Sequence, residues 1–229
     1  IATRLDAQGR PTPLIAETGG MNAMIVDSSA LTEQVVVDVL ASAFDSAGQR
    51  CSALRVLCLQ DDVADHTLKM LRGAMAECRM GNPGRLTTDI GPVIDAEAKA
   101  NIENHIQTMR AKGRPVFQAV RENSEDAREW QTGTFVPPTL IELASFDELK
   151  KEVFGPVLHV VRYNRNNLNE LIDQINASGY GLTLGVHTRI DETIAQVTGN
   201  TTVGNLYVNR NMVGAVVGVQ PFGGEGLSG

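Results

Sequence analysis

The sequence has few cysteines and no long apolar run, and each shortage excludes a class of protein. Its three cysteines, Cys51, Cys58 and Cys78, form no C-x-x-C pair. This excludes a disulfide framework and a zinc site, and it favours a reducing compartment such as the cytoplasm. The longest apolar runs, such as 213–219, are far shorter than the roughly 18 to 20 residues that span a bilayer. No basic-then-apolar signal opens the chain. We therefore expect a soluble, cytoplasmic protein without a resident metal.

Positive charge is also scarce. Lys+Arg number 20 against 27 for Asp+Glu, which gives a net charge of −7 and a pI near 5.1. Such a chain offers no basic surface to a phosphate backbone or to anionic lipid, so nucleic acid is excluded as a partner. What is present is ordinary: 42% hydrophobic and 21% charged residues over 229 positions are typical of a globular domain with a sizeable core.

Short apolar runs alternate with amphipathic segments along most of the chain. Predominantly apolar runs, typical of buried strands, occur at 14–16, 23–26, 54–59, 156–163, 182–187 and 203–208. The intervening segments with helical spacing of apolar residues are 31–47, 61–75, 96–112, 168–176 and 192–197. Strands that are apolar at every position need cover on both faces. The pattern therefore predicts an α/β fold with a mostly parallel sheet and helices on both faces.

Cys51 differs from the other two cysteines in its surroundings. Cys58 lies in an apolar strand and Cys78 near a helix end, as expected of small buried hydrophobic residues. Cys51 instead follows the glycine that ends a predicted helix, beside Arg50 and near Arg55, where a thiolate could be exposed and stabilised. It is the nucleophile candidate of this sequence.

A thiolate that forms an acyl intermediate needs a base to activate the water that releases it. Glu17 stands at the end of an apolar run and just before Gly19 and Gly20, which allow another backbone or a ligand to come close. By spacing alone, a solvated glutamate at a strand end is the more common explanation. The residue pattern leaves both interpretations open.

Four ordered motifs resemble those of the aldehyde dehydrogenase superfamily. Residues 17–20 resemble its E-x-G-G motif, and residues 48–51 resemble its G-Q-x-C nucleophile motif at the family's spacing. Residues 152–157 resemble its E-x-F-G-P-V cofactor motif, and residues 221–229 its P-F-G-G-x-x-x-S-G segment. The resemblance implies the aldehyde dehydrogenase catalytic-domain fold.

The same resemblance assigns roles to four residues of this sequence. Cys51 would attack the aldehyde carbon, and Glu17 would activate the water that releases the product. Glu152 would hold the nicotinamide ribose of NAD, and Phe154 would bound the nicotinamide ring. The resemblance thus implies an NAD-dependent oxidation of an aldehyde through a thiohemiacetal and a thioester.

Two segments resemble a narrower branch of the superfamily. Residues 50–55 and 209–222 are similar to the nucleophile and anchor loops of the 1-pyrroline-5-carboxylate dehydrogenase module of bacterial proline utilization A. This implies oxidation of L-glutamate γ-semialdehyde to glutamate in proline catabolism. Ser52 with the Gly214 and Ala215 N–H groups would bind the substrate carboxylate, and Phe222 would pack on its aliphatic part.

The resemblance also implies a domain organisation. Residues 1–22 would be the tail end of a dinucleotide-binding domain, and residues 23–229 a catalytic domain truncated before its C-terminal oligomerisation strand. The family's phosphate-binding loop has no counterpart in this sequence, so we expect the chain to be inactive by itself. Its partners would be the aldehyde substrate and the dinucleotide-binding domain. The parent enzyme is expected to be a homo-oligomer, with FAD only if a proline dehydrogenase domain precedes.

Two alternatives stay open at this stage. One is another semialdehyde dehydrogenase, such as one that acts on succinate semialdehyde, which a comparison of rates on the two semialdehydes would separate. The other is a non-catalytic scaffold domain that keeps the fold without the chemistry. Such a domain would show no fast-reacting cysteine at neutral pH.

Overall fold

A computed structural model describes residues 4–12, 19–120, 130, 132–216 and 218–229. Its strands are β1 (Ala23–Val26), β2 (Val56–Gln60), β3 (Val116–Gln118), β4 (Thr139–Leu143), β5 (Val157–Tyr163), β6 (Tyr180–Gly181), β7 (Thr183–His187), β8 (Asn205–Val208) and β9 (Glu225–Gly226). The α-helices are α1 (Thr32–Phe44), α2 (Asp61–Glu77), α3 (Ala96–Ala111), α5 (Leu168–Ala177) and α6 (Asp191–Asn200). Short 3-10 helices are η1 (Asp45–Gly48), η2 (Phe146–Glu148) and η3 (Arg165–Asn167).

Among the described residues, seven strands form one sheet in the order β3-β4-β5-β2-β1-β7-β8. All neighbours in it are parallel except β3 and β4. Strands β6 and β9 form a separate antiparallel pair. The expected α/β fold with a mostly parallel sheet is therefore confirmed.

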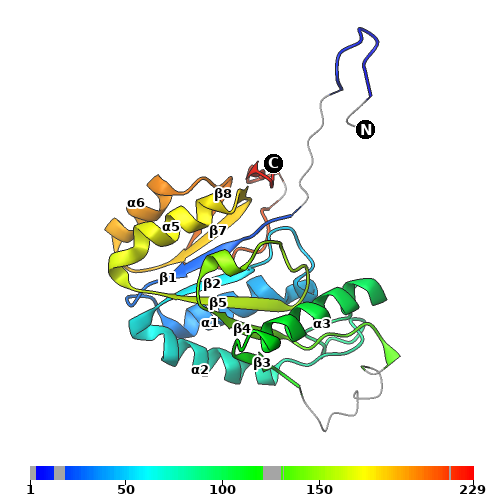
Figure 1. The fold of residues 1–229 in the computed structure, drawn as a ribbon, viewed down its shortest axis with the longest axis vertical. Helices are drawn as coiled ribbons and strands as arrows, with labels where there is room; N and C mark the ends of the chain where they lie inside the picture. Colours follow the sequence, from blue (N-terminus) through cyan, green and yellow to red (C-terminus); the bar gives the residue numbers. More distant parts are fainter. Residues whose placement is uncertain (1–3, 13–18, 121–129, 131, 217) are drawn as a thin grey trace.

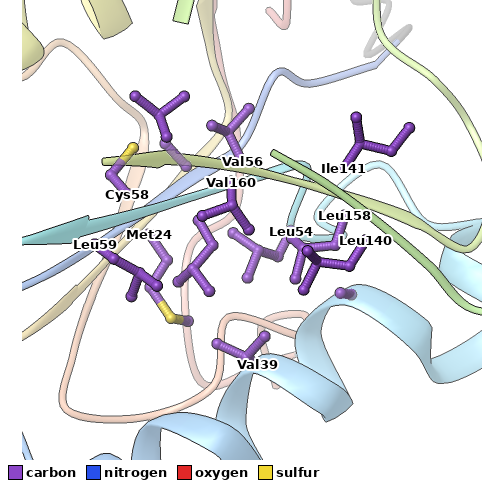
Figure 2. Close-up of a cluster of buried hydrophobic side chains, with 14 of the residues drawn as sticks. Met24, Val39, Leu54, Val56, Cys58, Leu59, Leu140, Ile141, Leu158 and Val160 are labelled. Carbon is purple, nitrogen blue, oxygen red and sulfur yellow. The ribbon is translucent and has the colours of Figure 1, made fainter. Parts of the chain in front are cut away.

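Helices cover both faces of this sheet (Figure 1). Leu158 and Val160 of β5 point with Met24 toward α1, where Val39 packs against them (Figure 2). His159, which lies between Leu158 and Val160 in β5, faces the other way and meets His105 of α3. Because successive strand residues point to opposite faces, α1 and α3 lie on opposite sides of the sheet.

The central strands show why the sequence contained unbroken apolar runs. Every residue of β1, β2 and β7 is buried, which leaves no solvent-facing position that would favour a polar residue. The first predicted helix is shorter than expected and ends at Phe44, because Ser46 and Ala47 adopt positive φ angles of 56° and 53°. The predicted strand at 14–16 lies outside the described residues.

The sheet topology places several loops at one edge. Residues 20–22, 51–55 and 152–156 immediately precede β1, β2 and β5, which run parallel and side by side. These loops therefore meet at the amino-terminal edge of the sheet. None of the described helices is long and apolar enough to cross a membrane.

Candidate active site

Cys51 lies in a loop between η1 and β2, and its side chain is partly accessible. Buried Asn22 fixes this loop, because its Nδ2 donates to the Cys51 carbonyl at 2.6 Å and to the Ala53 carbonyl at 2.8 Å. The Asn22 Oδ1 accepts the Thr183 N–H at 3.2 Å. The loop that carries the candidate nucleophile is thus tied to the starts of β1 and β7.

Gly48 allows a second loop to pack against the Cys51 loop. Its φ angle is +65°, and a Cβ atom at this position would lie 2.2 Å from the Gly155 carbonyl oxygen. Any side chain here would push the two loops apart. The glycine of the G-Q-x-C segment therefore brings residues 152–156 close to the loop of Cys51.

Cys51 opens on a cavity of about 490 Å³ that is formed by two segments far apart in the sequence. The cavity contains five residues that the sequence analysis singled out, and the full lining is Arg50, Cys51, Ser52, Gly214, Ala215, Gly218, Gln220 and Phe222. The fold therefore assembles the candidate nucleophile and the candidate substrate-binding residues around one space. Their individual roles stay predictions.

One candidate donor in this cavity is already paired. The Gly214 N–H, which we expected to face a substrate carboxylate, donates to the Met212 carbonyl at 3.2 Å. Gly214 has a φ angle of +69°, so the chain turns sharply here. Ser52 and the Ala215 N–H are the donors that we retain for a carboxylate.

Arg55 is a buried cation that joins the Cys51 loop to Glu152. Its guanidinium is 1% exposed and lies 2.8 Å from Oε1 of Glu152, a side chain that is 11% exposed. The Nε–H donates to the same oxygen at 2.9 Å. The remaining donors reach the Gly48, Arg50 and Gly155 carbonyls at 2.6, 3.1 and 3.3 Å. A fork of this kind fixes carbonyls of two loops with one side chain.

The charges around Arg55 extend to the candidate nucleophile. Burial lowers the pKa of Arg55, whereas the Glu152 carboxylate and the Cys51 thiol oppose that effect and raise it. Cys51 therefore lies within electrostatic reach of the buried guanidinium. Burial raises the pKa of Cys58 to about 12, and it also raises the pKa of Cys78, together with nearby Asp89. Cys58 and Cys78 are therefore poor nucleophiles.

Glu152 and Phe154 line a second cavity of about 590 Å³ beside α3. The Phe154 ring lies 5.0 Å from the Arg55 guanidinium and is still 45% exposed. Glu152 Oε2 accepts the Gly20 N–H at 3.1 Å, and a carboxylate has lone pairs left for further donors. These two residues are compatible with a ribose and an aromatic ring of NAD.

The loop that carries Cys51 borders both cavities. Gln49 lines the larger cavity and Arg50 the one that contains Cys51. Glu17 lies outside the described residues, and its role as a base stays a prediction. The described residues contain no group of three or more His, Cys, Asp or Glu side chains that could hold a metal.

Two residues of the site were not predicted from the sequence. Asn22 was not identified, and Arg55 was named only as a neighbour of Cys51. Asn22 carries a weak signal, since it is a polar residue that directly precedes the all-apolar run 23–26. Arg55 carries a stronger one, because it is a charge inside an apolar run and such a charge is seldom buried without a partner. The partner, Glu152, is 97 residues away in the chain and could not be identified from spacing.

The buried His159 contacts the main chain of Arg55 and pairs with the half-buried His105 of α3. His159 Nδ1 lies 3.1 Å from the Arg55 carbonyl oxygen, which can only accept, so this nitrogen carries a proton. Burial, with His105 adding to it, lowers the pKa of His159 to about 3. The ring is therefore neutral, and its Nε2 accepts from His105 Nε2 at 2.9 Å.

This pair predicts a pH dependence of stability. The unfolded chain binds a proton at His159 below about pH 6.5, whereas the folded protein binds it only near pH 3. The free energy of unfolding should therefore fall by about 1.4 kcal/mol per pH unit as the pH drops through this window. His159→Gln removes this contribution. Urea unfolding across the window should show a shallower slope for the variant, and equal slopes would contradict the assignment.

Comparison with known proteins agrees with this geometry. A family model described as "Aldehyde dehydrogenase family" matches residues 1–229. The bifunctional protein PutA of Salmonella typhimurium is 92% identical over 100% of this chain, which covers 17% of that protein. The 1-pyrroline-5-carboxylate dehydrogenase of Bacillus cereus strain B4264 is 34% identical over 94% of the chain and 41% of the relative. The chain thus spans less than half of the length of these relatives.

Solved structures give the same picture. A crystal structure of bifunctional proline utilization A (PutA) has a TM-score of 0.87 at 52% identity, over 94% of this chain and 21% of that one. A 1-pyrroline-5-carboxylate dehydrogenase from Thermus with bound NAD has a TM-score of 0.81 at 34% identity, over 93% of this chain and 40% of that one. With the family model matching the full sequence, the chain belongs to the aldehyde dehydrogenase family.

Proposed function

We propose that this chain is the catalytic domain of an NAD-dependent enzyme that oxidises L-glutamate γ-semialdehyde to glutamate in proline catabolism. The observation that carries the proposal is the cavity shared by Cys51, Ser52, Gly214, Ala215 and Phe222. The candidate nucleophile Cys51 shares this cavity with the 213–222 loop, which would contact a polar group at the far end of the substrate. The printed names of PutA and 1-pyrroline-5-carboxylate dehydrogenase among the relatives support it.

The proposed reaction uses Cys51 as a covalent catalyst. Its thiolate adds to the aldehyde carbon and forms a thiohemiacetal, with the Cys51 N–H as one donor to the developing oxyanion. Glu152 and Phe154 would hold NAD, which would supply the acceptor for the hydride that leaves this carbon. The resulting thioester is attacked by water, which Glu17 deprotonates, and the carboxylic acid leaves as the Cys51 thiol is restored.

The domain boundaries belong to the same proposal. Residues 1–22 would end a dinucleotide-binding domain, and residues 23–229 would form the catalytic domain of a longer homo-oligomeric enzyme. Glu152 and Phe154 contact only one end of a dinucleotide, and two such contacts do not offset the entropy of ordering it. We therefore expect activity from the full-length enzyme and not from the chain alone, and FAD only where a proline dehydrogenase domain is present.

Two semialdehydes that differ at the far end test the proposal directly. Glutamate γ-semialdehyde places its carboxylate one carbon farther from the aldehyde than succinate semialdehyde does, and it carries an ammonium beside that carboxylate. We expect kcat/KM of the full-length enzyme to favour glutamate γ-semialdehyde by about tenfold or more, the value of one charge-assisted hydrogen bond. Equal kcat/KM values, or a preference for succinate semialdehyde, would overturn the substrate assignment. An absence of any aldehyde oxidation would favour the scaffold alternative.

Ser52→Ala tests how the carboxylate is bound. Ser52 is buried and lines the cavity next to Cys51. Removing its hydroxyl should raise KM for glutamate γ-semialdehyde by about tenfold or more, since a hydrogen bond to a charged group is worth about 1.5 to 3 kcal/mol. Steady-state kinetics on an aliphatic aldehyde should change little. A uniform loss on both substrates would mean that Ser52 supports Cys51 and does not contact the carboxylate.

Glu17→Gln tests the proposed base. Without a carboxylate the thioester should form and then persist, because water is not deprotonated at this step. Stopped-flow measurement on the full-length enzyme should show a burst of NADH followed by slow turnover. Loss of the burst in proportion to the steady-state rate would instead place Glu17 in the activation of Cys51.

A further inference from the structure

The described residues of the segment 213–222, which are 213–216 and 218–222, reach the Cys51 cavity as a loop. Its described hydrogen bonds at 216–220 join residues of the loop to one another: Val216 N–H to Gln220 Oε1 at 3.1 Å, and the Val219 and Gln220 N–H groups to the Val216 carbonyl at 3.0 and 3.1 Å. Val216 and Val219 are 59% and 75% exposed. The position of this loop therefore depends strongly on how its two ends are held.

Ser42 holds the first end. This residue of α1 is 2% exposed, and its Oγ accepts the N–H of Met212 at 3.1 Å. The Ser42 hydroxyl proton is used elsewhere, since it is donated to the Asp38 carbonyl at 2.5 Å. Met212 is itself fully buried. One hydroxyl thus fixes the last anchored residue before the loop turns into the cavity at Gly214.

Ser42 also contacts the loop of the candidate nucleophile. Its backbone carbonyl accepts the N–H of Leu54 at 2.8 Å, three residues after Cys51. The side chain therefore fixes the 213–222 loop while the main chain fixes the Cys51 loop. Ser42 of α1 is thus hydrogen-bonded to both walls of the cavity.

Asn205 holds the other end of the loop. Its Nδ2 donates to the Gly223 carbonyl at 2.7 Å and to the Leu182 carbonyl at 3.0 Å. The neighbouring Gly204 allows this approach, because a Cβ atom there would lie 1.9 Å from the Gly223 oxygen. The 213–222 loop is thus held between Ser42 at one end and Asn205 at the other.

We propose that Ser42 and Asn205 are positioning residues that fix the 213–222 loop at the distance from Cys51 that suits an aldehyde with a carboxylate at its far end. The inference rests on the proposed function. Neither side chain lines the cavity, so both act through the loop. A displaced loop would weaken contact with the distant carboxylate and leave the reacting carbon at Cys51 unaffected.

Ser42→Ala removes the side-chain contact of Ser42 with the 213–222 loop and keeps its main-chain contact with the Cys51 loop. It removes the acceptor of the buried Met212 N–H, and an unpaired buried amide disfavours the present loop position. The Leu54 N–H keeps its bond, because its acceptor is the main-chain carbonyl. In the full-length enzyme, KM for glutamate γ-semialdehyde should rise about tenfold. The kcat value, the KM for propanal and the rate of Cys51 alkylation should stay near those of the unchanged enzyme.

Asn205→Ala and Thr139→Val complete the experiment. Asn205→Ala releases the opposite end and should give the same selective rise in KM, and it decides the question if Ser42→Ala does not fold. Thr139 is a matched control because its buried hydroxyl, like that of Ser42, donates one hydrogen bond and accepts another. It donates to the Pro137 carbonyl and accepts from Gln118 Nε2, but it lies in β4 and does not line the cavity. Thr139→Val should therefore leave the ratio of the two KM values unchanged.

The outcomes distinguish this inference from the proposed function. If the unchanged enzyme does not prefer glutamate γ-semialdehyde to propanal, the proposed function fails. If it does, and the folded variants leave KM unchanged or raise both KM values equally, the positioning role is refuted. A selective rise with Thr139→Val as well would also refute it, because any buried hydroxyl would then have the same effect.

Discussion

Cys51→Ala should abolish aldehyde oxidation by the full-length enzyme, with kcat lowered by about 10⁴-fold or more, since no covalent intermediate can form without the thiolate. The substitution removes a partly accessible sulfur from a loop that Asn22 and Arg55 hold through backbone carbonyls. Little packing is lost, so the fold should survive. Steady-state production of NADH and circular dichroism measure the two effects.

Cys78→Ala is the matched control for this prediction. Cys78 is also partly accessible, but it lies at the end of α2 and its thiol pKa is raised. Its removal should leave kcat within about twofold of the unchanged enzyme. If Cys51→Ala retained comparable activity, the cysteine chemistry assigned to this cavity would be wrong.

Arg55→Met should have the largest effect on stability, lowering the free energy of unfolding by about 3 to 5 kcal/mol. The substitution leaves Glu152 without its cation and deprives the Gly48, Arg50 and Gly155 carbonyls of their donor. Cys51 also loses a neighbouring cation and the hydrogen bond that holds the Arg50 carbonyl beside it, so its alkylation should slow. Urea denaturation and the alkylation rate measure these effects independently.

Arg55→Lys provides the comparison that separates charge from geometry. Lysine keeps the positive charge but cannot reach several acceptors with a planar fork. The alkylation rate of Cys51 in Arg55→Lys should stay closer to that of the unchanged protein. The free energy of unfolding of Arg55→Lys should lie between those of Arg55→Met and the unchanged protein. If Arg55→Met changed neither quantity, the buried guanidinium would have no part in organising the Cys51 loop.

Most of the fold was predictable because its central strands are buried on both faces and leave an unbroken apolar signal. Strands β3 and β4 were missed for two different reasons. Every residue of β3 is partly exposed, so this segment lacks the apolar run that marks a buried strand. Strand β4 is mostly buried, but it directly follows two prolines at 137 and 138, which are more typical of a loop. The early end of α1 was missed because Ser46 and Ala47 adopt positive φ angles, which neither residue type signals.

The site was predictable only where a motif carried it. Composition and spacing select Cys51 as a nucleophile candidate, but they do not bring it to Gly214 and Phe222, which the fold alone places in the same cavity. The pairing of Arg55 with Glu152 and the anchoring of Met212 by Ser42 join residues far apart in the sequence. Long-range contacts of this kind leave no periodicity in a single sequence, so the structure was needed to find them.

Alkylation of the full-length enzyme, followed by peptide mapping, tests the central claim that Cys51 is the nucleophile of this cavity. A thiol-directed reagent at neutral pH should modify Cys51 before Cys58 and Cys78, whose thiol pKa values are raised. The loss of aldehyde oxidation should be directly proportional to the modified fraction of Cys51. Glutamate γ-semialdehyde should slow both the alkylation of Cys51 and the inactivation. Full activity with Cys51 completely alkylated, or inactivation that follows Cys78 instead, would contradict the account.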